Sequence, residues 1–243
     1  MTQGSVSYES ENDVAVITIR RPDKRNSITS VVAEQLEQAW LQFEVSSDRV
    51  AVLTGEGSQA FTGGVDMTDP PTGGYPYVAG LGTEVTKPII CAVSGWCVGV
   101  GMAFVQYADL CVASESAVFY YPEAKMGLGR GILAGLVSRM PHKIVAELMM
   151  LGQQVPAARM EQHGLVNRLT TDDDLLPTAL EMAGVIAAQD PSISQFYKRN
   201  LQAVLVQSPG EIAERTRLLG DRLPGNAAAN LNRARRSVAA ASA

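Results

Sequence analysis

Residues 87–101, KPIICAVSGWCVGVG, change character half-way along. The first half, PIICAV at 88–93, is an uninterrupted apolar run of strand length, which is typical of a strand buried on both faces. The second half carries glycines at 95, 99 and 101 and leads into residues 100–107, which we expect to form a helix. The first N–H groups of such a helix lack intrahelical partners, and the helix dipole adds partial positive charge there. The segment therefore predicts a layered α/β fold with an anion site made of backbone groups.

The segments on either side extend the α/β pattern. Apolar runs at 14–19 (VAVITI) and 50–54 (VAVLT) predict strands, and the helical spacing of apolar residues over 28–43 places a helix between them. Short apolar strands around a helix favour a parallel sheet that is covered on both faces, with a right-handed crossover. Residues 109–113 predict another strand. Further along, the pattern predicts a brief strand at 166–169 and helices at 144–151, 157–163, 175–188 and 193–205.

A second glycine-rich turn, AFTGGVD at 60–66, follows the strand predicted at 50–54. Gly63 and Gly64 let the backbone turn sharply and leave the N–H of Val65 able to point into a cleft, although a pair of glycines can also mark a plain tight loop. Neither turn has the glycine spacing of a nucleotide-binding fingerprint. Two backbone donors, one from each turn, suit an acyl thioester whose carbonyl oxygen gains negative charge during reaction.

Composition narrows the class of protein. The chain has 243 residues, 46% of them hydrophobic and 19% charged, which indicates one folded α/β domain followed by a small helical region. A net charge of -5 without a long basic run argues against nucleic acid as a partner. Cys91, Cys97 and Cys111 fit neither a redox nor a zinc pattern, so we expect small buried side chains in a reduced compartment. No signal peptide or membrane span is evident, and we expect a cytoplasmic enzyme.

Five segments, taken in order, resemble the enoyl-CoA hydratase/isomerase (crotonase) family. They are RRPDKRNSIT at 20–29, FTGGVD at 61–66, KPIICAVSGWCVGVG at 87–101, ADLCVASESAVFYYPEAKMGLG at 108–129 and LMMLGQQVPAARMEQHGLVNRL at 148–169. The resemblance implies a spiral of β-β-α units, with an acyl-CoA-binding core at 1–190 and a helical C-terminal trimerisation region at 191–243. It further implies a homotrimer or a dimer of trimers, with coenzyme A present as part of the thioester substrate and no tightly bound cofactor.

The resemblance also assigns roles to residues. Val65 and Val100 would supply the two N–H groups of an oxyanion hole, and Glu123 would act as acid and base. Carboxylates suit that role because burial can raise their pKa toward the working pH. Contacts to coenzyme A would come from Arg25, Asn26, Ser27, Gly63 and Gly64, mostly through the main chain, and from Asp66. No metal is expected, since the two histidines, His142 and His163, lie far from both turns in sequence.

One position departs from the family pattern. The place of the second hydratase glutamate is taken by Ala103, which cannot transfer a proton. Hydration or double-bond isomerisation of an enoyl-CoA remain the leading reactions. Decarboxylation or C–C hydrolysis through the same enolate, and a catalytically impaired acyl-CoA-binding protein, are the alternatives. If Arg130 met a polar acyl group, it would favour decarboxylation or C–C hydrolysis.

Residues 69–82 form the longest stretch without periodicity. It is either a surface linker or a mobile loop over a site, and Tyr75 and Tyr77 favour a loop that packs.

Overall fold

A computed structural model describes residues 4–128 and 132–221 of the chain. Its larger sheet has the strand order β1-β2-β3-β5-β7-β10. The strands are β1 (Ser5–Glu11), β2 (Val14–Arg20), β3 (Val50–Gly55), β5 (Ile89–Val93), β7 (Leu110–Ser114) and β10 (Arg168–Thr170). Only the β1–β2 pair in this sheet is antiparallel, and the other four pairs are parallel. The predicted parallel sheet is thus confirmed.

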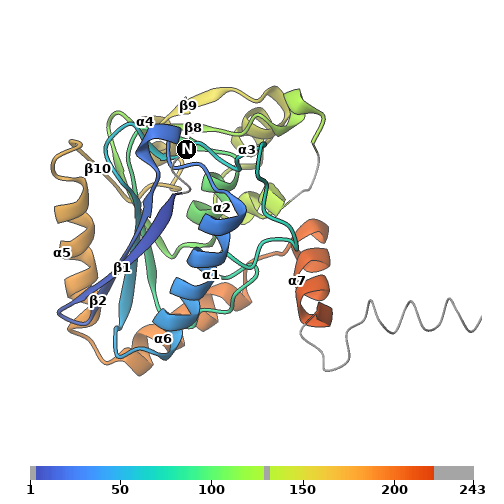
Figure 1. The fold of residues 1–243 in the computed structure, drawn as a ribbon. Helices are drawn as coiled ribbons and strands as arrows, with labels where there is room; N and C mark the ends of the chain where they lie inside the picture. Colours follow the sequence, from blue (N-terminus) through green and yellow to red (C-terminus); the bar gives the residue numbers. More distant parts are fainter. Residues whose placement is uncertain (1–3, 129–131, 222–243) are drawn as a thin grey trace, which may run out of the picture.

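Helices cover both faces of the larger sheet (Figure 1). On one face lie α1 (Ser30–Val45) and α2 (Val100–Tyr107), and on the other lies α5 (Leu175–Ala187). Side chains of the strands alternate between the two faces, so that Val50 and Val52 pack with α5 while Ala51 and Leu53 pack with α1 and α2. The three cysteines are free and buried, as predicted, and their burial raises the pKa of each thiol.

The start and the buried face of α1 follow from its sequence. The Thr29 hydroxyl caps the helix by accepting the N–H of Val32 at 3.2 Å. Leu36, Trp40 and Phe43, spaced by four and three residues, lie on one side of the helix and are at most 1% exposed.

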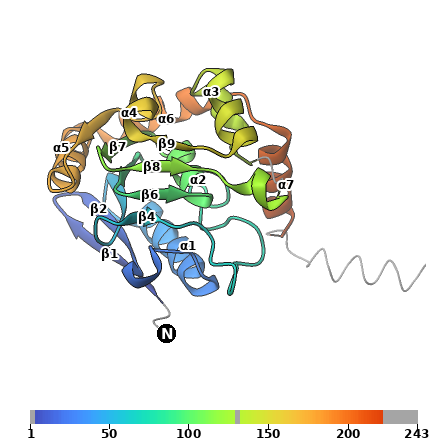
Figure 2. The same cartoon turned by 90° about the horizontal axis from the view of Figure 1, so that it is seen from above.

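A second sheet has the order β4-β6-β8-β9 and crosses the molecule beside the first (Figure 2). Its strands are β4 (Ala60–Thr62), β6 (Trp96–Val98), β8 (Val118–Tyr120) and β9 (Gln154–Pro156). Each of these strands has three residues, and β9 pairs antiparallel with β8. Because β4 and β6 pair in parallel, the two glycine-rich turns that follow them lie at the same edge of the sheet.

The C-terminal half is mainly helical, as predicted. It contains α3 (His142–Ala146), which continues into a π-helical turn at Glu147–Leu151, then α4 (Ala157–Gln162), α6 (Pro191–Ala203) and α7 (Pro209–Asp221). Short 3-10 turns lie at Pro22–Lys24, Glu123–Met126 and Ile132–Ser138. Residues 222–243 and Arg130 lie outside the described residues. A role of region 191–243 in oligomerisation therefore stays a prediction.

Residues 69–82 form a packed loop rather than a surface linker. Tyr77, Val78 and Leu81 are at most 3% exposed, and the Trp40 indole N–H donates to the Tyr77 carbonyl at 3.0 Å. None of the described helices is long and apolar enough to cross a membrane.

Candidate active site

The two glycine-rich turns touch each other. Gly64 has φ +92° and Gly99 has φ +56°, a region that favours glycine. A methyl group added to Gly64 would lie 3.2 Å from the carbonyl oxygen of Val98. A methyl group on Gly99 would lie 3.9 Å from the Gly64 Cα and 3.1 Å from Glu123 Oε1. The absence of side chains at these two positions thus lets the turns and Glu123 come together.

The N–H of Val65 donates no hydrogen bond to any described residue, although its neighbours are all engaged. Ile28 donates to the Gly64 carbonyl at 2.8 Å and accepts the Asp66 N–H at 2.9 Å. The N–H of Gly63 donates to the Arg25 carbonyl at 2.6 Å. Since successive N–H groups of an extended segment point to opposite sides, the Val65 N–H points away from Ile28.

The N–H of Val100 is unpaired in the same sense within the described chain. Val100 is the first residue of α2, and Gly99 precedes it as the N-cap. The Gly99 N–H donates to the Tyr120 carbonyl at 3.0 Å, and the Met102 N–H donates to the Gly99 carbonyl at 3.0 Å. Val100 carries one of the N–H groups that a helix cannot satisfy internally, at the positive end of the helix dipole.

Both valines and Glu123 line one cavity of about 310 Å³. Most of its wall is apolar or aromatic, as is usual for pockets that hold organic ligands. The apolar and aromatic side chains come from Met67, Pro70, Pro71, Tyr75, Tyr77, Val98, Tyr121, Pro122, Met126, Leu128 and Ile132. Gly63, Gly64 and Gly99 also line the cavity, at the two turns.

Glu123 is the one carboxylate among the described residues that line the cavity. Its position follows from Pro122, the N-cap of the 3-10 turn that begins at Glu123. Burial raises the pKa of Glu123 to about 7. Its Oε2 is buried and accepts no hydrogen bond from a described residue. Such an atom marks a place where a ligand or water would supply the missing partner.

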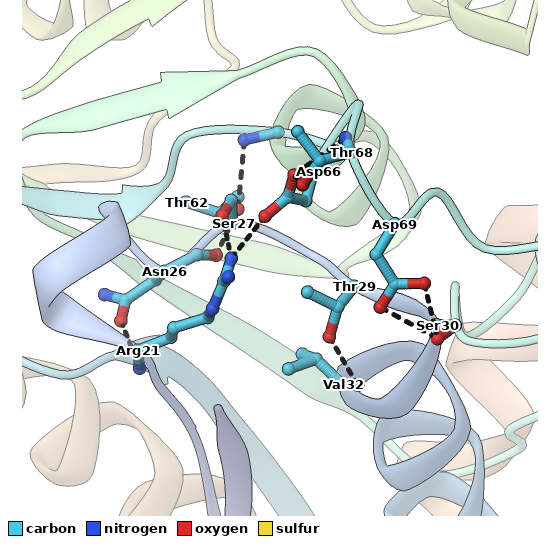
Figure 3. Close-up of polar contacts among 11 residues, drawn as sticks. Arg21, Asn26, Ser27, Thr29, Ser30, Val32, Thr62, Asp66, Thr68 and Asp69 are labelled. Carbon is cyan, nitrogen blue, oxygen red and sulfur yellow. Dashed lines mark hydrogen bonds and ion pairs between the residues drawn. The ribbon is translucent and has the colours of Figure 1, made fainter. Parts of the chain in front are cut away.

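Asn26, predicted to contact coenzyme A mostly through its main chain, supports the first turn with its side chain (Figure 3). Its side chain is 1% exposed, donates to the carbonyls of Glu56 and Ala60 at 3.0 and 2.7 Å, and accepts the Arg21 N–H at 2.9 Å. Its carbonyl accepts the Thr62 hydroxyl at 2.7 Å, and that hydroxyl accepts the Gly64 N–H at 3.1 Å. The amide therefore fixes the turn and does not line the cavity.

Asp66 and Ser27 also support the first glycine-rich turn, together with Arg21. Arg21 donates to Asp66 at 2.7 Å and to Ser27 at 2.6 Å (Figure 3). Hydrogen bonds from Thr68 and then from Arg21 hold the pKa of Asp66 well below its usual range. Asp66 thus stays ionised and is no candidate for proton transfer. The side chains of Asp66 and Ser27 do not line the cavity. Arg25, another residue predicted to contact coenzyme A, is exposed and lies next to Gly63.

The sequence did not predict that Arg21 and Thr62 also support the first glycine-rich turn. Arg21 sits in a cluster of four basic residues, 20, 21, 24 and 25, a pattern that fits either a local binding site for a charged ligand or a solvated turn, yet its side chain is 8% exposed. The partner that explains its burial, Asp66, is 45 residues away.

Ala103 is fully buried in the core and does not line the cavity. The nearby Gln106 and Tyr107 lie one turn further along α2, and both donate to Glu211 of α7, at 3.1 and 2.6 Å. Among the described residues that line the cavity, no second carboxylate accompanies Glu123. The described part of the chain holds no group of three or more His, Cys, Asp or Glu side chains that could bind a metal ion.

The model of the family described as enoyl-CoA hydratase/isomerase matches residues 9–220. The chain belongs to this family. It is thus an acyl-CoA enzyme of the enoyl-CoA hydratase/isomerase type.

Curated relatives in this family are hydratases and dehydratases. The mevalonyl-coenzyme A hydratase of Aspergillus fumigatus is 34% identical over 196 residues, which cover 73% of this chain and 70% of that protein. The enoyl-CoA hydratase EchA19 of Mycobacterium tuberculosis is 31% identical over 210 residues, or 80% of this chain and 79% of that protein.

Solved structures agree on the fold. A carnitinyl-CoA hydratase from Mycobacterium avium has a TM-score of 0.78 at 27% identity, covering 91% of this chain and 92% of the other. The expectation of a crotonase-like α/β fold is confirmed.

Proposed function

We propose that the protein catalyses the reversible hydration of an enoyl-CoA thioester, with Glu123 as acid and base and the N–H groups of Val65 and Val100 as an oxyanion hole. The feature that supports this reaction most directly is Glu123, a cavity carboxylate with a pKa of about 7 and one buried, unpartnered oxygen. An acid whose pKa is near neutral can both accept and return a proton at working pH.

In the direction of dehydration, the substrate is a 3-hydroxyacyl thioester. The Glu123 carboxylate removes the proton from the α-carbon of a 3-hydroxyacyl thioester, and the electron pair moves onto the carbonyl oxygen. The N–H groups of Val65 and Val100 stabilise that negative charge, and each such donor is typically worth about 2.7–4 kcal/mol in the transition state. The enolate then expels the 3-hydroxyl group, which leaves as water after it takes the proton from Glu123. Hydration is the reverse sequence.

The remainder of the substrate fits the surroundings of the turns. The acyl group would occupy the apolar part of the cavity, next to Met126 and Ile132. The coenzyme A part would leave along the main chain of Gly63 and Gly64, where the exposed Arg25 can meet a phosphate. Asn26, Ser27 and Asp66 would contribute to binding through the shape they give to this turn, rather than by side-chain contact.

Ala103 favours a second candidate reaction, double-bond isomerisation. Shifting a double bond from the 3- to the 2-position needs only one group, which removes a proton from the α-carbon and returns it to the γ-carbon. Hydration, by contrast, is easier with a second group to hold the water. The curated relatives are hydratases and dehydratases, so the comparisons do not favour the decarboxylase, C–C hydrolase or binding-only alternatives.

Isotope labelling separates the two reactions. The enzyme is given 2-enoyl-, 3-enoyl- and 3-hydroxyacyl-CoA substrates in heavy-oxygen water and in deuterium oxide. Hydration places the heavy oxygen at the β-carbon, whereas isomerisation converts the 3-enoyl thioester without uptake of oxygen. Glu123→Gln should lower the rate of the reaction at least about 1000-fold, because it removes the proton carrier.

The matched control is Glu34→Gln, which changes an exposed glutamate on α1. It should leave the rate unchanged. The proposal fails if no thioester of the panel reacts, or if Glu123→Gln retains the wild-type rate.

A further inference from the structure

One wall of the cavity belongs to the loop at 69–82, which has almost no regular secondary structure of its own. Pro70, Pro71, Gly74, Tyr75 and Tyr77 contribute to this wall. The far end of the loop is fixed from within the core, because the Trp40 indole donates to Tyr77 and the Thr83 hydroxyl donates to the Pro76 carbonyl at 2.7 Å. The wall-forming stretch 73–75 is held in a different way.

Side chains of α7 hold residues 73–75 from outside. Glu214 Oε1 accepts the backbone N–H of Tyr75 at 2.9 Å, and the Arg217 guanidinium donates to the Gly73 carbonyl. Glu214 and Arg217 also form an ion pair at 2.8 Å, one helical turn apart. A methyl group at Gly74 would collide with both side chains, so the pair packs directly on the loop backbone. The clamp, Glu214 with Arg217, thus bonds the residues on either side of Gly74.

The helix α7 is itself attached to the helix that carries Val100. Its first turn is a capping box, in which Glu211 Oε2 accepts the Ser208 N–H at 2.7 Å and the Ser208 hydroxyl accepts the Glu211 N–H at 3.2 Å. Glu211 is 3% exposed, and its Oε1 accepts the Tyr107 hydroxyl of α2 at 2.6 Å. The helix α7 therefore links the cavity wall at 73–75 to α2 and fixes their relative positions.

We propose that Glu214 is a positioning residue that sets acyl-group selectivity by holding the cavity wall at 73–75, an inference that rests on the proposed acyl-CoA function. The side chain of Glu214 does not line the cavity and takes no part in proton transfer. Its removal deletes the acceptor of the Tyr75 N–H and one partner of Arg217, both charge-assisted contacts. Residues 73–75 can then move outward. This change lowers the affinity for a short acyl group only slightly and makes room for a long one.

The test measures binding of unreactive saturated thioesters, so that it does not depend on turnover. Butyryl-CoA and octanoyl-CoA are titrated calorimetrically into the full-length wild type and into Glu214→Ala, and the ratio of the two dissociation constants is compared. We expect Glu214→Ala to shift this ratio by at least about fivefold in favour of octanoyl-CoA. Glu214→Asp, whose carboxylate is one methylene short of Tyr75, should shift it the same way and decides the matter if the alanine variant does not fold.

Two further variants serve as controls. Glu214→Gln keeps the Oε1 acceptor and should stay within about twofold of the wild-type ratio, because the contact to Tyr75 survives. Thr216→Ala removes an exposed hydroxyl of the same helix that bonds back to the Ile212 carbonyl at 2.8 Å, and it should behave like the wild type.

An unchanged ratio in both the Ala and Asp variants, or equal weakening of both ligands, would overturn the role of Glu214. In that case the proposed function still stands, provided that Glu123→Gln abolishes turnover. If the wild type binds neither thioester, the proposed function falls and this inference falls with it.

Discussion

Glu123 owes its raised pKa to its surroundings. Glu123 lines the cavity together with apolar residues such as Val98, Pro122 and Met126, and burial is the main cause of the shift to about 7. Oε1 would lie 3.1 Å from a methyl group added at Gly99, so this oxygen faces the second turn. A carboxyl group held in this way is protonated in about half of the molecules near neutral pH.

A pH profile should report this group. Removal of the α-proton needs the carboxylate form, so the rate of α-proton exchange in deuterium oxide should rise with pH through about 7 and level off above it. At pH 5 the kcat/KM for exchange should be about 100-fold below the plateau, since the carboxylate fraction falls tenfold for each pH unit. The measurement is α-deuterium incorporation by mass spectrometry at a series of pH values. A profile that is flat from pH 5 to 8 would argue against Glu123 as the base.

Asn26 illustrates a residue whose effect on the site is indirect. Its side chain satisfies three backbone groups, from Arg21, Glu56 and Ala60, and Asn26 itself is 1% exposed. Asn26→Ala should lower the free energy of unfolding by about 3 kcal/mol, because each buried group left unpaired costs roughly 1–3 kcal/mol and some relax. Urea denaturation checks this value.

The control for Asn26 is Asn200→Ala, at an exposed position on α6 where the amide bonds only to the Phe196 carbonyl among the described residues. Its unfolding free energy should change by less than about 0.5 kcal/mol. Equal effects of the two substitutions would show that Asn26 does not brace the turn.

Among the elements, the first glycine-rich turn depends on backbone geometry that no side chain supplies. Gly64→Ala places a methyl group in a left-handed conformation, 3.2 Å from the Val98 carbonyl oxygen. We expect a loss of about 1–3 kcal/mol in stability. We also expect at least about a tenfold fall in kcat, because the Val65 N–H moves away from the developing charge.

Gly57 provides the comparison for Gly64. Its φ is +78°, so alanine meets a similar backbone strain, but no atom lies within 4 Å of the added methyl group. Gly57→Ala should therefore lower the melting temperature while kcat stays at the wild-type value. If both alanine variants lose activity to the same extent, the contact between the two turns is not what matters.

The predictability of the elements depended on their length and pattern. The strands at Val14–Arg20 and Val50–Gly55 are apolar and long enough to stand out, and α2 was predicted with its observed bounds. The three-residue strands β4, β6, β8 and β9 are too short to show a period of two, so none of them was predicted. The polar strand β1 was also missed, since it lies at the edge of the sheet and only three of its seven residues are half-buried.

The site residues also differ in how far the local sequence could predict them. The roles of the two turns and of Glu123 could be proposed because local motifs carry them. The supporting contacts could not, since Arg21 meets Asp66 across 45 residues and Glu214 meets Tyr75 across 139. The sequence around Arg21 or Glu214 does not indicate which distant residue will be its hydrogen-bond partner.

At the scale of the whole molecule, α6 and the residue that follows it carry a row of exposed apolar side chains. Ile193, Tyr197, Leu201 and Val204 recur at spacings of four, four and three and are 48–79% exposed. A row of this kind on one helix face is typical of an association surface, and we predict that it takes part in the trimer that the family resemblance implies. The other side of α6 is fixed to the chain, because Lys198 pairs with Asp109 at 2.9 Å and donates to the Lys87 carbonyl at 2.7 Å.

Light scattering after size-exclusion chromatography tests the association. The wild type should have about three or six times the chain mass of 25.9 kDa. Leu201→Glu puts a charge into the apolar row and should shift the protein toward the monomer, since burying an unpaired carboxylate costs several kcal/mol. Arg199→Glu, which alters an exposed polar position on the same helix, should keep the wild-type mass. A monomeric wild type would show that the predicted trimer does not form. A Leu201→Glu variant with unchanged mass would show that the protein associates through another surface.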